Sequence, residues 1–330
     1  MSTLSQTAQF TQVVHRFEPN SNLRRWWHLK DDPLGHTTVL EVERTDDNLS
    51  GNLCRWVVRR HGVRDLQANP NIAADEFALL DCLLKHGIAT ATPYYLDTSC
   101  EILPTPYLII EFMDGQPVYG PLPSEQVKPY AVQIATQMAK IHQLDVALLD
   151  VPFLVAQCED PSKIAAKQVE RFERRIERLI RANQEQKEQW TFHEKLIQAW
   201  PLPQAETSVL LHGDFWPGNL LWKNHELVAV IDWEDAHLGN PLEDFAITRF
   251  DILFIYGLEA MTIFTDTYRS LSSLDFTTLP YWDLYAALRA APVLDEWSEG
   301  WAELGRPDLT ETEIHKKLAW FVAQALDALV

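Results

Sequence analysis

The stretch LLHGDFWPGNLLWKNHELVAVIDWED, from Leu210 to Asp235, decides how this chain is interpreted. Most of its residues are apolar or β-branched, which is typical of buried strands. His212, Asp214, Asn219 and Asp232 interrupt that apolar pattern. Because burying polar side chains costs free energy unless they are paired or bound, we expect these four residues to serve one site.

The second half of the stretch predicts a β-hairpin. Apolar segments flank the four-residue turn KNHE at 223–226. With this turn at the tip, Leu220 pairs near Val230, and Asn219 falls beside Asp232. These two polar residues are therefore predicted to be the feet of one hairpin.

The two feet are suited to a hard cation. Paired strands lie about 4.8 Å apart, so the amide oxygen of Asn219 and the carboxylate of Asp232 can reach the same ion. Mg²⁺ fits this set because it takes few protein oxygens and fills its other positions with water and phosphate. We therefore expect Asn219 and Asp232 to be magnesium ligands.

Asp214 precedes Asn219 by five residues. The same spacing occurs in the pattern H-R-D-x-x-x-x-N, where the aspartate accepts the proton of a substrate hydroxyl and the asparagine binds a metal. The order of a loop aspartate, a foot asparagine, a hairpin and a foot aspartate favours phosphoryl transfer. Such chemistry requires alignment of the hydroxyl and neutralisation of phosphate charge.

Two more polar residues are candidates for structural support. We expect His212 to brace the loop by hydrogen bonding, the alternative being a second base or a metal ligand. Asp244 ends the segment GNPLED, which is typical of a helix N-terminus. Its carboxylate either favours that helix end or reaches back to steady the loop.

Outward from this stretch, the first third of the chain is rich in strand formers. Segments 23–29, 37–45 and 53–61 are separated by turn residues and predict an antiparallel meander. A helix follows and ends at Gly87. A buried strand at 106–115 then marks a boundary near Met113, which predicts a first lobe of residues 1–113 and a second of residues 114–330.

The second lobe is predicted to be mostly helical. Stripes of buried residues at helical spacing are expected from Val127 to Ile141 and from Ile314 to Leu329. Segment 162–190 carries four arginines on one face. Their favourable spacing from glutamates indicates a solvated face, and binding of an anionic group is the alternative; they are Arg171, Arg174, Arg178 and Arg181.

Charge and cysteine usage limit the partners and the compartment. The 330 residues include 47 Asp and Glu against 28 Lys and Arg, a formal net charge of −19. This charge repels nucleic acid and anionic membrane surfaces, so we expect neither as a partner. It serves solubility, or it faces a cationic substrate. The four dispersed cysteines fit a reducing cytoplasm, and no export signal or membrane anchor is visible.

The segments HGDFWPGN and VIDWEDAHLGNPLEDFA resemble the aminoglycoside phosphotransferase and choline kinase family. The resemblance implies an α+β, two-lobed, protein-kinase-like fold with a small antiparallel-sheet lobe and a larger helical lobe. It also implies the role of catalytic base for Asp214 and of magnesium ligands for Asn219 and Asp232. Asp244 matches a structural aspartate of that family.

The same resemblance extends to the first lobe, where the order of the elements matches the family better than any sequence motif does. The segment WVVRRHG resembles the strand that carries a phosphate-contacting base, and alternation along the strand selects Arg59. Glu76 is placed like the acid that pairs with this base. Glu111 to Met113 resemble the hinge on which adenine lies.

Three departures from the family pattern affect the nucleotide site. Arginine replaces the usual lysine at position 59, which keeps the charge but changes the geometry. The glycine-rich phosphate loop is absent, leaving only Gly35. Eight residues separate Asp232 from Pro241, which leaves no room for a long activation loop.

The sequence thus predicts an ATP- and Mg²⁺-dependent kinase that phosphorylates a hydroxyl of a small molecule. The acidic excess favours a cationic acceptor such as an amino sugar or amino alcohol. One alternative is a kinase-like nucleotide-binding module that has lost turnover. Another is a hydrolase that uses His212 and Asp214 as H-x-D metal ligands, although the further ligands of a two-metal site are missing from the pattern.

Overall fold

The computed structural model describes residues 5–29, 37–45, 52–155, 208–290, 294 and 300–329. The chain divides into two compact units, Met1–Asp114 and Gly115–Val330. This division falls one residue beyond the position at which the sequence predicts a boundary. Each unit is described by itself.

The first unit is built on an antiparallel sheet in the order β1-β2-β3-β5-β4. The predicted meander is confirmed as its first three strands. The edge strand β4 is not foreseen from the sequence, and neither is the helix α1 that precedes β1. The strands are β1 (Ser21–His28), β2 (Thr37–Arg44), β3 (Leu53–Arg60), β4 (Pro93–Asp97) and β5 (Tyr107–Glu111).

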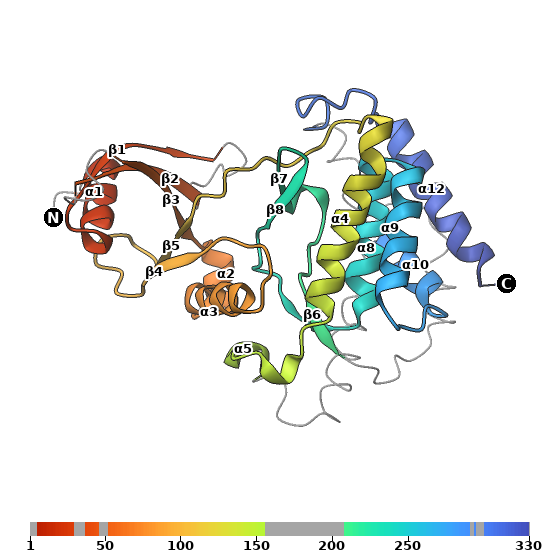
Figure 1. Cartoon of the computed structure of the whole chain (residues 1–330), viewed down its shortest axis with the longest axis horizontal. Helices are drawn as coiled ribbons and strands as arrows, with labels where there is room; N and C mark the ends of the chain where they lie inside the picture. The colour runs from red at the N-terminus through yellow and green to blue at the C-terminus, as the bar shows by residue number, and fades with distance from the viewer. Residues whose placement is uncertain are drawn as a thin grey trace. The chain divides into compact units, whose positions relative to one another are not determined.

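Helices pack on this sheet and determine the use of its two faces. Helix α1 (Gln6–Phe17) packs against β1, and α3 (Ile72–Lys85) packs against β4 and β5 (Figure 1). Trp56 and Val58 of β3 share a core with Phe10 of α1. Since side chains alternate along a strand, Arg59 points to the opposite face. A short helix, α2 (Val63–Ala68), connects β3 to α3.

The second unit is mainly helical. Helix α8 is buried at all of its 15 residues and packs against α9, α10 and α12 (Figure 1). A helix that is buried on every side is typical of the centre of a domain, and α8 has this position although it includes four charged residues. The long helices are α4 (Ser124–His142), α8 (Pro241–Ile255), α9 (Leu258–Leu271), α10 (Leu279–Ala290) and α12 (Glu311–Asp327), and short ones are η1 (Val146–Leu148) and α5 (Pro152–Val155).

Two small antiparallel ribbons accompany these helices. Strand β6 (Val209–Leu211) pairs with β9 (His237–Gly239), and β7 (Leu220–Lys223) pairs with β8 (Glu226–Val230). Strand β9 occupies the short interval between Asp232 and α8. The loop that carries Asp214 follows β6, so the β6–β9 ribbon holds one end of this loop.

Most helix predictions are confirmed in the described residues. The buried stripe of α4 runs from Val127 to Ile141, and Gly87 ends α3 with a left-handed φ of 73°. The C-terminal stripe is correct through Ala325, but Leu329 lies beyond the end of α12. The arginine-rich segment 162–190 and Gly35 lie outside the described residues.

Two further observations apply to the described part of the chain. Its helices include none that is both long and apolar enough to cross a membrane. Cys54, Cys82 and Cys100 are free thiols.

Candidate active site

The predicted hairpin is present, but its turn has two residues, Asn224 and His225, in place of the predicted four, and a β-bulge interrupts the register between Leu221 and Trp222. Leu220 pairs with Val230. At its tip Asn224 and His225 have left-handed φ values of 51° and 68°. Two successive left-handed residues form the type of turn whose twist matches a two-residue hairpin, and asparagine adopts this conformation more readily than most residues.

The two feet of the hairpin meet through the backbone. The Ile231 N–H donates a hydrogen bond to the carbonyl oxygen of Asn219 at 3.0 Å. Asp232 follows directly with a left-handed φ of 66°, a conformation that a non-glycine residue adopts at a small steric cost. Asn219 and Asp232 therefore lie at the same end of the ribbon.

Asp214 is joined directly to Asn219. The side-chain nitrogen of Asn219 donates to the Asp214 carbonyl oxygen at 2.9 Å and to its Oδ2 at 3.2 Å. With Nδ2 used in this way, Oδ1 of Asn219 receives no hydrogen bond from the described residues. The amide oxygen of Asn219 and the carboxylate of Asp232 are oxygen ligands of the kind that Mg²⁺ prefers.

His212 links the loop to the hairpin through both of its ring nitrogens. Its Nδ1 accepts from the Asp214 N–H at 3.3 Å, and Nε2 lies 2.9 Å from the Ile231 carbonyl oxygen. A neutral imidazole protonated on Nε2 satisfies both contacts. Burial lowers the pKa of His212, which favours this neutral form. Neither nitrogen is then left for a metal ion.

Asp244, in the first turn of α8, holds the start of the same loop. Its Oδ2 accepts from the His212 N–H at 2.7 Å, and its Oδ1 accepts from the Gly213 N–H at 3.0 Å. Burial alone would raise the pKa of Asp244, but hydrogen bonding and charge from His142 and other histidines keep that pKa below its ordinary value. The buried carboxylate thus stays ionised and reaches back to the loop.

The loop geometry also requires glycine at position 213. Gly213 has a φ of 85°, and a Cβ added there would lie 2.3 Å from the Asp235 carbonyl oxygen. Any side chain would therefore push the loop away from the segment that follows Asp232.

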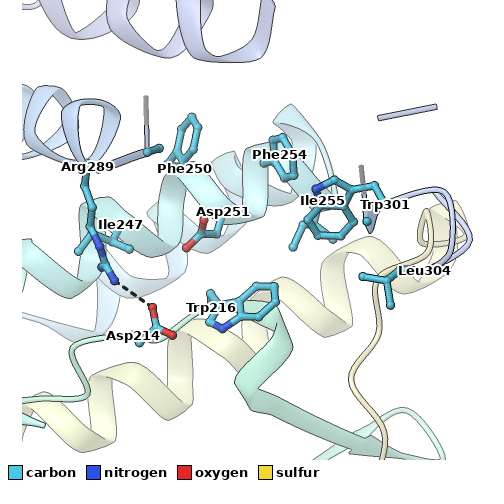
Figure 2. Close-up of a pocket in the computed structure, with 13 residues that line it drawn as sticks. Asp214, Trp216, Ile247, Phe250, Asp251, Phe254, Ile255, Arg289, Trp301 and Leu304 are labelled. Atoms are coloured by element: carbon cyan, nitrogen blue, oxygen red, sulfur yellow. Dashed lines mark hydrogen bonds and ion pairs between the residues drawn. The ribbon is translucent and has the colours of Figure 1, made fainter. Parts of the chain in front are cut away.

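A cation contacts the candidate base. Nη2 of Arg289, on α10, lies 3.0 Å from Oδ1 of Asp214, and Nη1 donates to the Gly213 carbonyl oxygen at 3.3 Å (Figure 2). Burial raises the pKa of Asp214, while the charge of Arg289 opposes the shift without cancelling it. The Asp214 side chain keeps 36% of its surface exposed, so it is accessible to a ligand.

Asp214 and Arg289 face a cavity of about 560 Å³ that lies wholly in the second unit. Asp251 of α8 also lines this cavity. The rest of its wall is largely apolar and aromatic, and includes Trp216, Ile247, Phe250, Phe254, Trp301 and Leu304 (Figure 2).

In the first unit, Arg59 and Glu76 form an ion pair. Nε of Arg59 lies 2.9 Å from Oε1 of Glu76, and Nε2 of His61 lies 2.7 Å from Oε2. Burial would raise the pKa of Glu76, but the charge of Arg59 and the contact with His61 lower it overall. The acid is therefore a buried carboxylate with two basic partners.

The two predicted hinge residues occupy the end of β5 and the link after it. Glu111 Oε2 accepts from Thr92 Oγ1 at 2.6 Å and from the Thr92 N–H at 3.3 Å. Met113, two residues later, is half-buried. These contacts fix the backbone near Glu111.

The family of the chain follows from its sequence match. The model of the phosphotransferase enzyme family matches residues 35–272, which include the loop and hairpin that carry Asp214, Asn219 and Asp232. The chain belongs to the phosphotransferase enzyme family. The resemblance identified from its sequence motifs is confirmed.

Solved structures establish the fold of this chain. A provisionally named aminoglycoside phosphotransferase from Ralstonia eutropha JMP134 aligns with a TM-score of 0.64 at 15% identity, over 98% of both chains. APH(2")-IIIa in complex with GDP and kanamycin aligns with a TM-score of 0.60 at 17% identity, over 96% of this chain and 98% of the other. The predicted α+β, protein-kinase-like class is confirmed.

A curated relative is much longer. Acyl-CoA dehydrogenase family member 10 from Mus musculus is 24% identical over 251 residues, which cover 73% of this chain and 22% of the relative. The chain therefore spans about a fifth of that relative's length.

Several residues of the candidate site and its surroundings were not identified from the sequence. Arg289 and Asp251 each stand in an otherwise apolar run, YAALRAAP and FDILFIYG. A lone charge among buried helix residues is a usable signal for a site. His61 lies two residues after Arg59, which suggests the same face of the sheet, and Trp216 lies inside the segment HGDFWPGN, where no role was predicted for it.

Proposed function

We propose that this protein is an ATP- and Mg²⁺-dependent phosphotransferase that moves the γ-phosphoryl group to a hydroxyl of a small molecule. One arrangement carries the proposal: the Asp214 carboxylate lines a cavity of about 560 Å³ while it is hydrogen-bonded to Asn219, at the foot of the hairpin that ends in Asp232.

Asp214 is the proposed base. The acceptor hydroxyl oxygen bonds to the γ-phosphorus, its proton passes to an Asp214 oxygen, and the bond from the γ-phosphorus to the bridging oxygen of ADP breaks. The raised pKa of Asp214 supports this role, because a base works best when its pKa approaches the working pH. Arg289 and Asn219 hold the two carboxylate oxygens and orient them.

Asn219, through Oδ1, and Asp232 are the proposed magnesium ligands. When bound, Mg²⁺ neutralises phosphate charge. In the described residues, no group of three or more His, Cys, Asp or Glu side chains is placed to hold a metal. A magnesium ion shared between one amide, one carboxylate and phosphate oxygens requires no such group.

In the first unit, we assign nucleotide binding to Arg59, with Glu76 as the acid that orients it, and to the backbone at Glu111 and Met113. The Arg59–Glu76 ion pair supports this assignment. Arg59 contacts Glu76 through Nε, so its terminal nitrogens extend further than a lysine amine would. The GDP in APH(2")-IIIa makes GTP the nucleotide to compare with ATP.

A direct test measures product. The protein is incubated with Mg²⁺ and ATP, or GTP, and a broad set of alcohols, amino alcohols and amino sugars, and mass spectrometry detects a gain of one phosphoryl group. Product formation is the expected result. Binding of Mg-ATP without any product would instead support the alternative of a nucleotide-binding module that has lost turnover. A cytoplasmic location and the absence of nucleic-acid and membrane partners stay predictions from the sequence.

A further inference from the structure

The cavity beside Asp214 contains an acid that the proposed transfer does not use. Asp251 lies on the face of α8 that lines this cavity, and only 9% of its surface is exposed. Its carboxyl makes no hydrogen bond or ion pair with any described residue. In Figure 2 it is directed into the space that it shares with Arg289 and Asp214. A buried polar group with no partner is costly, and a ligand can remove that cost.

The surroundings of Asp251 favour its neutral form. The charged groups that face it in the described residues are Asp214, on the loop after β6, and Arg289, on α10. Burial raises the pKa of Asp251 to about 8, the charge of Asp214 adds to the shift, and Arg289 opposes it. At neutral pH the side chain therefore offers an O–H donor and a carbonyl acceptor.

The rest of the cavity is unsuited to a cation. Trp216, Phe250, Phe254, Trp301 and Leu304 supply apolar surface, and Arg289 adds a positive charge. An ammonium group that entered would lose its hydration, while the Asp214 carboxylate is already paired with Arg289 and the neutral Asp251 carries no charge to offset that loss. The acidic residues that give the chain its net charge of −19 are therefore not concentrated on the wall of this cavity.

We propose that the acceptor is an alcohol on a mostly apolar, uncharged skeleton, and that Asp251 determines specificity by hydrogen-bonding a second polar atom of it. The proposal rests on the proposed function for the transfer itself. The expectation of a cationic acceptor, drawn from total charge, is replaced by one drawn from the cavity wall.

The first experiment compares matched ligands. The probes are straight-chain 1,2-alkanediols of four to ten carbons and 3-phenylpropane-1,2-diol, each paired with the amino alcohol in which an ammonium replaces one hydroxyl, and kanamycin. Binding is measured by calorimetry and turnover by ADP release with Mg-ATP. Each neutral diol is expected to bind at least about tenfold more tightly than its amine partner. Equal or tighter binding of the amines or of kanamycin would overturn the proposal.

The second experiment tests Asp251. Asp251→Leu is expected to weaken diol binding roughly fivefold to tenfold, whereas Asp251→Asn, which keeps a donor and an acceptor, retains most of it. Asp266→Asn, on the exposed face of α9, is the matched control and should change nothing. Equal diol affinity in Asp251→Leu and the parent, with both folded by circular dichroism, would remove Asp251 from the acceptor site.

A pH series separates recognition from a structural role. Because the carboxyl exchanges its O–H donor for a second acceptor as Asp251 ionises, diol binding by the parent protein should change with pH around the pKa of about 8, whereas binding by Asp251→Asn should stay flat. Identical profiles would count against the proposal. The two hypotheses fail separately: diol binding without phosphorylated product defeats the proposed function alone, and phosphorylation of kanamycin without diol binding defeats the acceptor class alone.

Discussion

At the scale of single residues, the contacts of Asp214 indicate how strongly catalysis depends on one carboxylate. Asp214→Asn keeps the shape and the contact with Asn219 but cannot accept a proton. We expect kcat to fall by about 10²–10⁴, the usual contribution of a general base, with little change in KM. Steady-state ADP release measures this fall. Asp266→Asn serves as the control, and a variant that turned over like the parent would show that another group removes the proton.

Asp251 also has a consequence for folding stability. Its pKa rises from 3.8 to about 8 on folding, so between these two values the folded chain holds a proton that the unfolded chain has lost. Stability must therefore fall as pH rises through this window, at up to about 1.4 kcal/mol per pH unit. Asp251→Asn should remove this contribution to the slope and leave that of other buried acids with a raised pKa, such as Asp214. Urea unfolding at pH 5, 6, 7 and 8 checks this, and parallel curves for the two proteins would contradict it.

At the scale of elements, the loop after β6 depends on its close approach to the segment after β8. Gly213→Ala places a Cβ 2.3 Å from the Asp235 carbonyl oxygen at a left-handed φ. We expect a loss of about 2–3 kcal/mol of stability and a large loss of activity, because Asp214 is the next residue. Gly120→Ala is the matched control, since nothing lies within 4 Å of its added Cβ. Chemical denaturation of both variants measures the difference.

Elements with strong local patterns were predictable from the sequence. The hairpin followed from its turn, although the β-bulge that places Leu220 opposite Val230 did not, and the α4 stripe followed from its period of apolar residues. Strand β4 and helix α1 were missed, because PYYLD is short and α1 begins within an N-terminal segment assessed only as a leader. Contacts between residues far apart in sequence, such as Arg289 with Asp214, have no local pattern that could predict them.

At the scale of the whole molecule, the chain divides into two compact units. A substitution that destabilises one unit therefore need not destabilise the other. Glu76→Gln should lower the stability of the first unit by about 1–3 kcal/mol and leave the second unit intact. Hydrogen exchange followed by mass spectrometry should show faster exchange in β3 and α3 and unchanged exchange in α8. Equal acceleration in both units would contradict this independence.

The pH dependence of the same variant has a definite sign. The pKa of Glu76 is lowered below its ordinary 4.5 on folding, so its ion pairs stabilise the parent fully above that value. The stabilisation is lost as pH falls through the lowered pKa. The difference between parent and Glu76→Gln should therefore be constant near neutrality and shrink only in acid. Thermal unfolding of the parent and of Glu76→Gln from pH 7 down to pH 3 tests this pH dependence.

Helix α8 both forms the centre of the helical packing and lines the cavity. It is enclosed along its entire length, yet Ile247, Phe250, Asp251, Phe254 and Ile255 also form one wall of the cavity. Attempts to re-engineer acceptor preference through this helix will compete with folding, because every altered side chain is also part of the central packing. Substitutions at Leu304, which is partly exposed, offer a route to altered preference that is less coupled to thermostability.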